Sequence, residues 1–168
     1  MKIKLKVLKE SALYGDVINW LEGLLKSRNK KSLVRVYNTS RIALRSFLQS
    51  EGYDKFFKDF ISYEIRVDIT GFVIKKREAY MSFVECKINP ISLKDISQLL
   101  GYSRVALPQN SIILSPNGIS SAMSYLLKTL NRLDVLEYDK NKKIKVVKWD
   151  LSKKDVDHSS ILPSGETV

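Results

Sequence analysis

The sequence predicts an α/β protein in which a central mixed β-sheet is covered by helices on both faces. Three observations predict this class: two alternating strands joined by a short charged turn, a capped helix directly after them, and two later strands separated by a helix. A chain of 168 residues, of which 44% are apolar, can form one domain with a sizeable core.

The first sixty residues are expected to be mainly helical. Lys2–Leu8 alternates lysine with apolar residues, which predicts a short strand. Asp16–Lys26 carries apolar residues at helical spacing, and a second helix, capped by Thr39 or Ser40, ends near Gly52. An aromatic-rich segment after this glycine predicts a further short helix.

The middle of the chain predicts an antiparallel hairpin. Ile65–Thr70 alternates apolar and polar residues, as a half-buried strand does. Lys75, Lys76 and Arg77 form the charged turn, and Tyr80–Lys87 is the second strand.

The elements after the hairpin follow from caps and apolar runs. Ser92 caps a helix that Gly101 ends, and residues 111–114 form a fully apolar strand. Asn117 opens the longest helix, and Ile144–Trp149 closes the core as a strand.

The domain expectation follows from this order. Residues 1–151 form a single domain, with a helical part at 12–60 and a core at 60–150, and residues 152–168 form a polar, flexible tail. The chain shows neither a signal peptide nor an apolar run long enough to span a membrane, so we expect an intracellular, cytoplasmic protein.

The charge balance points to a polyanionic partner. Lys and Arg number 29 against 18 Asp and Glu, a formal net charge of +11, which favours nucleic acid first and an anionic membrane surface second. The single cysteine, Cys86, excludes a disulfide framework and multi-cysteine metal sites. The single histidine, His158, lies in the tail, so a histidine-based triad in the core is excluded as well.

Two carboxylates and a lysine form the candidate catalytic group. Asp68 lies in the first strand of the hairpin, and Glu85 and Lys87 share one face of the second. Because neighbouring strands lie about 4.8 Å apart, Asp68 and Glu85 can meet across the hairpin. Paired carboxylates suit Mg²⁺ or Mn²⁺, and the lysine can stabilise charge on a phosphate or help to activate water. The alternative is an acid and a lysine on a solvated sheet face.

These residues resemble a family of nucleases. Asp68 in IRVDITGF, Glu85 and Lys87 in FVECK, and the following helix ISLKDISQLLGY are similar to the PD-(D/E)xK superfamily, over roughly Glu64–Trp149. The resemblance implies a restriction-endonuclease-like core with extra N-terminal helices. It also implies hydrolysis of nucleic-acid phosphodiesters, with Asp68 and Glu85 holding the metal and Lys87 positioning or activating water. The small, basic, Lys/Ile-rich composition resembles nucleases of archaea and their viruses.

The resemblance implies further site residues. Gln98 would approach the site from the following helix, where a solvated polar face is the equal alternative. Some members, such as archaeal Holliday-junction resolvases, add an acid from the first helix, and Glu22 is the candidate for that metal ligand here.

Basic residues near the candidate group are expected to contact nucleic acid. They are Arg66, Lys75, Lys76, Arg77 and Lys94. Arg66 can instead pair with Glu64 or Asp68, and the basic loops can be solvated.

The predicted function is a divalent-metal-dependent DNA endonuclease that selects structure, such as a junction, a flap or an end. No sequence-specific reader motif is visible, which favours recognition of shape. The expected partner is DNA, branched or single-stranded, and a homodimer is expected because branched or two-strand substrates call for paired sites. The alternative is an inactive nucleic-acid-binding protein on a nuclease-like scaffold. A module that binds polyanions or membrane surfaces is a third reading.

Overall fold

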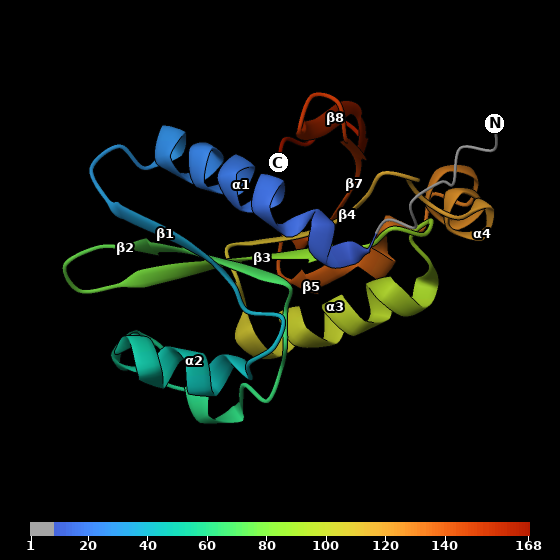
Figure 1. Cartoon of the computed structure of the whole chain (residues 1–168). Helices are drawn as coiled ribbons and strands as arrows, with labels where there is room; N and C mark the ends of the chain where they lie inside the picture. Colours follow the sequence, from blue (N-terminus) through green and yellow to red (C-terminus); the bar gives the residue numbers. More distant parts are fainter. Residues whose placement is uncertain (1–8) are drawn as a thin grey trace.

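A mixed six-stranded sheet forms the centre of the computed structural model, which describes residues 9–168 (Figure 1). The predicted strand at Lys2–Leu8 lies outside the described residues. The strand order is β1-β2-β3-β4-β7-β8, and a second, two-stranded sheet pairs β5 with β6. The strands are β1 Leu33–Asn38, β2 Ile69–Ile74, β3 Ala79–Cys86, β4 Asn110–Ser115, β5 Glu137–Asp139, β6 Lys142–Lys143, β7 Lys145–Asp150 and β8 Asp155–Leu162.

The helices lie before, between and after these strands. The α-helices are α1 Tyr14–Arg28, α2 Leu44–Glu51, α3 Leu93–Ala106 and α4 Ser121–Ser124. The shorter turns are η1 Glu10–Ala12, η2 Asp54–Phe56, η3 Phe60–Ser62, the π-helical η4 Tyr125–Thr129 and η5 Leu133–Leu136.

The sheet changes from antiparallel to parallel at β3. Strands β1, β2 and β3 form an antiparallel meander, whereas β3, β4 and β7 run parallel and β8 returns antiparallel. The charged turn at 75–78 closes the β2–β3 hairpin, with the Lys75 amide donating to the Glu78 carbonyl. A parallel neighbour needs a crossover connection, and α3 supplies it between β3 and β4. The predicted α/β class with a mixed central sheet is confirmed.

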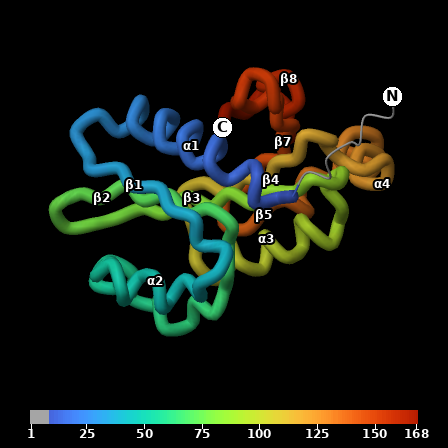
Figure 2. The backbone as a smooth tube through the Cα atoms, in the orientation of Figure 1, coloured from blue at the N-terminus to red at the C-terminus, as the bar shows by residue number. Residues whose placement is uncertain are grey.

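Helices cover both faces of the sheet, as predicted. On one face α1 buries Val17, Leu21 and Leu25 against β2 and the central strands. On the other face lie α2 and α3, with Phe47 and Leu99 in a core that includes aromatic residues of β2 and β3. Figure 2 shows the α1 tube on one side of the sheet and α2 and α3 on the other.

Two of the helix limits differ from the prediction by several residues. Helix α2 begins at Leu44 rather than after Thr39 or Ser40, although it ends at Gly52 as expected, with a left-handed φ of 68°. Helix α3 starts after Ser92 as predicted but passes through Gly101 to Ala106. Glycine costs a helix about 1 kcal/mol, which packing of α3 against the sheet outweighs.

The segment predicted as the longest helix is broken into short turns. Its apolar spacing is helical, yet α4 has four residues and passes into the π-helical η4. Asn131 then adopts a φ of 51°, which a right-handed helix cannot contain, so the chain turns before η5. The longest described helix is α1, with 15 residues.

Two strands of the central sheet were not foreseen, and neither were the short β5 and β6. Strand β1 occupies the stretch between the first two helices and pairs along its length with β2. Strand β8 lies in the predicted tail, where Val156, Ile161 and Leu162 are buried and pairing with β7 completes the sheet. The expectation of a polar, flexible tail is therefore wrong for this segment.

Candidate active site

Asp68 and Glu85 lie opposite each other where β2 and β3 meet. Asp68 occupies the bend just before β2, and Glu85 is the penultimate residue of β3. The hairpin pairs Ile69 with Val84, so one further step of the same register brings Asp68 opposite Glu85. The expected meeting of the two acids across the hairpin follows from this register.

Asp68 is held by three elements. Its Oδ1 accepts a hydrogen bond from the Tyr14 hydroxyl of α1 at 2.6 Å, and its Oδ2 accepts from the Cys86 amide of β3 at 2.9 Å. Its backbone carbonyl accepts from the Thr39 amide at 2.9 Å. The bend at Asp68 also breaks the predicted alternation, because Val67 and Ile69 join the cores on opposite faces of the sheet.

Glu85 is a buried carboxylate with one unsatisfied oxygen. The residue is 5% exposed, and its Oε1 accepts from Lys87 Nζ at 2.9 Å, whereas Oε2 has no hydrogen-bond partner among the described residues. Burial, followed by the nearby Asp68 charge, raises the pKa of Glu85 to about 7. A buried carboxylate with a vacant acceptor and a raised pKa is suited to receive a proton or a cation.

Lys87 lies between two acids. Its Nζ is 2.9 Å from Glu85 Oε1 and 4.0 Å from Glu10 Oε1, and the side chain is only 17% exposed. Burial by itself lowers the pKa of an amine, but the charges of Glu85 and Glu10 outweigh it, so the pKa of Lys87 is raised. Lys87 is therefore an ammonium ion at neutral pH, fixed beside the two carboxylates.

The donor set fits a hard divalent cation. Mg²⁺ binds through one or two carboxylates and fills its remaining positions with water and phosphate oxygens. The orphaned Glu85 Oε2 and the adjacent Asp68 carboxylate provide such a pair. Within the part of the chain that the structure describes, no group of three or more His, Cys, Asp or Glu side chains could hold a metal. A cation here would depend on two protein carboxylates.

A cavity of about 560 Å³ opens beside Asp68. Its walls come from the segment around η1 and from the turn between β1 and α2, and Tyr14 and Asp68 lie where these meet. The lining residues are Lys9, Glu10, Ser11, Tyr14, Asn38, Ser40, Arg41 and Asp68. A substrate group in this cavity would contact the Asp68 carboxylate directly.

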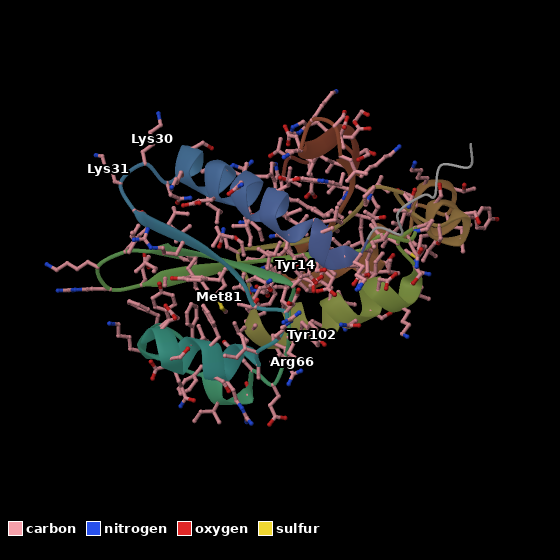
Figure 3. All side chains as sticks on the ribbon, in the orientation of Figure 1. Tyr14, Lys30, Lys31, Arg66, Met81 and Tyr102 are labelled. Carbon is pink, nitrogen blue, oxygen red and sulfur yellow. The ribbon has the colours of Figure 1, made fainter. Side chains whose placement is uncertain are left out.

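Gln98 and the cations predicted beside it lie on exposed surface. The Gln98 amide donates to the Tyr102 hydroxyl of the same helix at 3.3 Å, and Lys94 is exposed one turn earlier. Arg66 is exposed two residues before Asp68 and is labelled in Figure 3. No hydrogen bond or ion pair among the described residues joins Gln98, Lys94 or Arg66 to the two acids.

Glu22 is not brought to the site. Its carboxylate forms an ion pair with Lys26 at 2.7 Å on the surface of α1. At 1.5 Å per residue, Glu22 lies about 12 Å along the helix from Tyr14, the residue that reaches Asp68. The acid that approaches the site from the N-terminal side is instead Glu10.

The basic turn Lys75–Arg77 lies at the opposite end of β2. Six strand residues at about 3.3 Å each separate it from Asp68 by about 20 Å. Strand β1 pairs Leu33 with Ile74, so the loop before β1, which carries Lys30 and Lys31, lies at that same end of the sheet (Figure 3).

Sequence reasoning missed Tyr14 and Glu10. Tyr14 begins α1, two residues before the predicted helix start, and Glu10 lies in a short turn that has no periodic pattern. Neither residue carries a sequence signal, because their place at the site follows only from how α1 packs across β2.

Comparisons with protein-family models, with curated proteins and with solved structures found no match to this chain. No helix in the described part of the chain is long and apolar enough to cross a membrane.

Proposed function

We propose that this protein is a divalent-metal-dependent nuclease with a restriction-endonuclease-like core, of the PD-(D/E)xK type. The observation that carries the proposal is the arrangement of Asp68, Glu85 and Lys87. A carboxylate from the bend before β2 lies opposite one from the end of β3, one carboxylate oxygen is buried without a partner among the described residues, and an ammonium group is fixed beside them.

The sheet topology supports the same proposal. An antiparallel meander is followed by a crossover helix and a parallel fourth strand, and Glu85 lies near the end of β3, the strand at which the sheet changes from antiparallel to parallel. The formal charge of +11 suits a polyanionic substrate, and we propose DNA, branched or single-stranded, as that substrate.

Each residue has a distinct role in hydrolysis. Asp68 and Glu85 would hold Mg²⁺ or Mn²⁺, which when bound polarises the phosphate and makes water a better nucleophile. Lys87 keeps its proton, so it stabilises the negative charge that develops on the phosphate rather than accepting a proton. Tyr14 and the Cys86 amide fix the orientation of the Asp68 carboxylate through their hydrogen bonds.

A second candidate is a DNA-binding protein that does not cut. Both Asp68 oxygens already accept hydrogen bonds, and the described residues include no third acid close enough to complete a metal site. These observations favour a scaffold that binds DNA through its positive charge alone.

Cleavage assays distinguish the two candidates. Labelled duplex, single-stranded, flap and four-way-junction DNA are incubated with the protein and Mg²⁺ or Mn²⁺, beside an EDTA control. We expect cutting that needs the metal and that Asp68→Asn reduces at least a hundredfold, about 3 kcal/mol of transition-state stabilisation. The control Asp134→Asn alters an exposed acid paired with Arg132 and should cut normally.

Binding without cutting of any substrate would refute the nuclease and leave the second candidate. Light scattering of the same sample, alone and with a four-way junction, would show whether the protein is the expected homodimer.

A further inference from the structure

The cavity beside Asp68 contains a cation that the proposed chemistry does not use. Arg41 lines it, is exposed, and forms no ion pair with any carboxylate among residues 9–168. Arg45, four residues later and at the start of α2, is instead paired with Glu64 at 2.8 Å. An arginine left without an acid beside a carboxylate site is available for an anionic ligand.

The turn that carries Arg41 is fixed to Asp68. Thr39, 1% exposed, donates its amide to the Asp68 carbonyl at 2.9 Å, and its hydroxyl donates to the Val67 carbonyl at 2.7 Å. The Thr39 hydroxyl also contacts the hydroxyl of Thr70 at 2.8 Å. Arg41 follows two residues later, so its backbone has a set position relative to the candidate catalytic acid.

A second set of bonds shapes the same turn. Asn38 Oδ1 accepts from the Ser40 amide at 3.1 Å and from the Ser40 hydroxyl at 2.7 Å. These bonds close a local turn between β1 and α2. The side-chain NH2 group of Asn38, which lines the cavity, is left as a hydrogen-bond donor. The turn that carries Arg41 is thus held in one conformation before any ligand binds.

The charges of the cavity select its ligand. Lys9 and Arg41 carry positive charge, while Glu10 and Asp68 carry negative charge. A divalent cation on the candidate acids would leave the cavity net positive. A volume of about 560 Å³ lies in the range of small-ligand sites and is large enough for one nucleotide unit.

The geometry points to Arg41 as a phosphate-binding residue that holds the nucleic-acid strand in this cavity, at the phosphodiester next to the one that is cut. The inference rests on the proposed function, since it takes the substrate to be a nucleic-acid strand. A guanidinium binds a phosphate through two parallel hydrogen bonds, and it contributes to substrate binding while the reacting phosphate contacts the acids and Lys87.

Two substitutions and a matched control test the inference. Arg41→Ala removes the guanidinium, and Arg41→Lys keeps the positive charge but not the two parallel N–H donors. The control, Arg45→Ala, removes a nearby arginine that is already paired with Glu64. Binding is measured by fluorescence anisotropy with a labelled 20-nucleotide single strand and with the matching duplex. Ca²⁺ replaces Mg²⁺ in these titrations so that binding is measured with the metal site occupied by a hard cation.

We expect Arg41→Ala to weaken binding about tenfold, the effect of one charge-assisted phosphate contact. The slope of log affinity against log salt should fall by about one. Arg41→Lys should recover part of the affinity, and Arg45→Ala should bind as the wild type does. With Mg²⁺, Arg41→Ala should raise KM while kcat stays within about twofold, as loss of uniform substrate binding requires.

The outcomes separate this inference from the nuclease proposal. Equal affinities for Arg41→Ala and Arg45→Ala overturn the phosphate-binding role of Arg41, whether or not the protein cuts DNA. Weaker binding by Arg41→Ala without cutting by the wild type supports the cavity and refutes the nuclease. Failure of the wild type to bind either probe overturns both.

Discussion

Glu85 combines burial with negative charge, and this conflict makes it the most informative single residue. Its Oε1 is satisfied by Lys87, but Oε2 is sealed from water without a donor among the described residues. Ionising this carboxyl therefore costs folding free energy unless a cation compensates. The protein is expected to be less stable when Glu85 is charged and no metal is bound.

This cost gives stability a defined pH dependence. The pKa of Glu85 is about 7 in the folded protein, above its ordinary value of 4.5, so the folded state binds the proton more tightly. The resulting stability is fully present below pH 4.5 and is lost as pH rises to 7, by about 3 kcal/mol. Urea denaturation in EDTA measures the free energy of unfolding at pH 5 and at pH 8. Glu85→Gln should make the two values nearly equal, and a variant with the pH dependence of the wild type would contradict the raised pKa of Glu85.

Tyr14 permits a test of how Asp68 is held. Tyr14→Phe keeps the ring but removes the 2.6 Å hydrogen bond to Asp68 Oδ1. Because the acceptor is a carboxylate, the free energy of unfolding should fall by about 1–2 kcal/mol. Thermal denaturation at pH 8 in EDTA measures the loss. The control Tyr125→Phe changes an exposed tyrosine and should leave stability unaltered.

At the residue scale the sequence predicted the centre of the site but not its surroundings. Glu85 and Lys87 follow from their positions at the end of the second strand, and pairing across one tight turn brings Asp68 opposite Glu85, although Asp68 lies in a bend and not in the predicted strand. Tyr14, Glu10 and Arg41 reach the site through packing between elements distant in the chain, which no local pattern encodes. Glu22 shows the same limit, because helical spacing cannot say which turn of α1 lies beside Asp68.

At the scale of elements, α1 and β2 form the contact that positions the N-terminal side of the site. Gly71 of β2 provides the space, since a Cβ there would lie 2.8 Å from Leu25 Cδ1 and 3.1 Å from Leu21 Cδ2. The absent side chain allows α1 to lie close across the strand. Tyr14 at the start of that helix reaches Asp68 as a result.

Two glycine substitutions should have opposite effects. Gly71→Ala forces Leu25 and Leu21 to move within the core and should lower the free energy of unfolding by about 1–2 kcal/mol. Gly101→Ala, inside α3 with nothing within 4 Å, should raise it by up to about 1 kcal/mol. Chemical denaturation of both variants measures the difference. Equal effects would contradict the close packing of α1 on β2.

Some elements could be predicted and others could not, for physical reasons. The presence of the hairpin and the start of α3 depend on local signals, namely a charged turn and a capping box of Ser92 with Asp95. The predicted limits of the first hairpin strand are wrong, because β2 begins at Ile69 rather than Ile65 and does not alternate in burial. Strands β1 and β8 are formed by pairing with β2 and β7 at the two edges of the sheet. Edge strands are only partly buried, so their sequences lack a strong apolar pattern.

At the scale of the whole molecule, positive charge gathers at one end of the sheet. Lys30, Lys31, Lys76 and Arg77 are exposed on two adjacent loops there, and Lys75 is paired with Glu78. The distance of about 20 Å from Asp68 corresponds to about six base pairs of duplex. Under the proposed function, the basic end of the sheet would contact the duplex arm of the substrate, away from the candidate site.

Removing the charges of the hairpin turn tests this placement. Lys75→Ala, Lys76→Ala and Arg77→Ala together should weaken duplex binding and reduce the slope of log affinity against log salt by about two. Salt titrations by anisotropy measure the slope. The control replaces Lys140, Lys142 and Lys143 with Ala on another hairpin, where Lys142 and Lys143 are paired with Asp139 and Glu137. Equal slopes for the two triple variants would exclude a special role for the β2–β3 turn.

The candidate site is drawn entirely from residues 9–87, and strands β4, β7 and β8 support it from behind. Strand β4 pairs with β3 at Glu85 and Cys86, and its Leu114 carbonyl accepts the Lys87 amide at 2.8 Å. Random mutagenesis should therefore divide the gene into two kinds of region. Inactivating changes after residue 110 should be temperature-sensitive and recoverable on cooling or by stabilising second-site changes, whereas those at the acids and Lys87 should be inactive at every temperature.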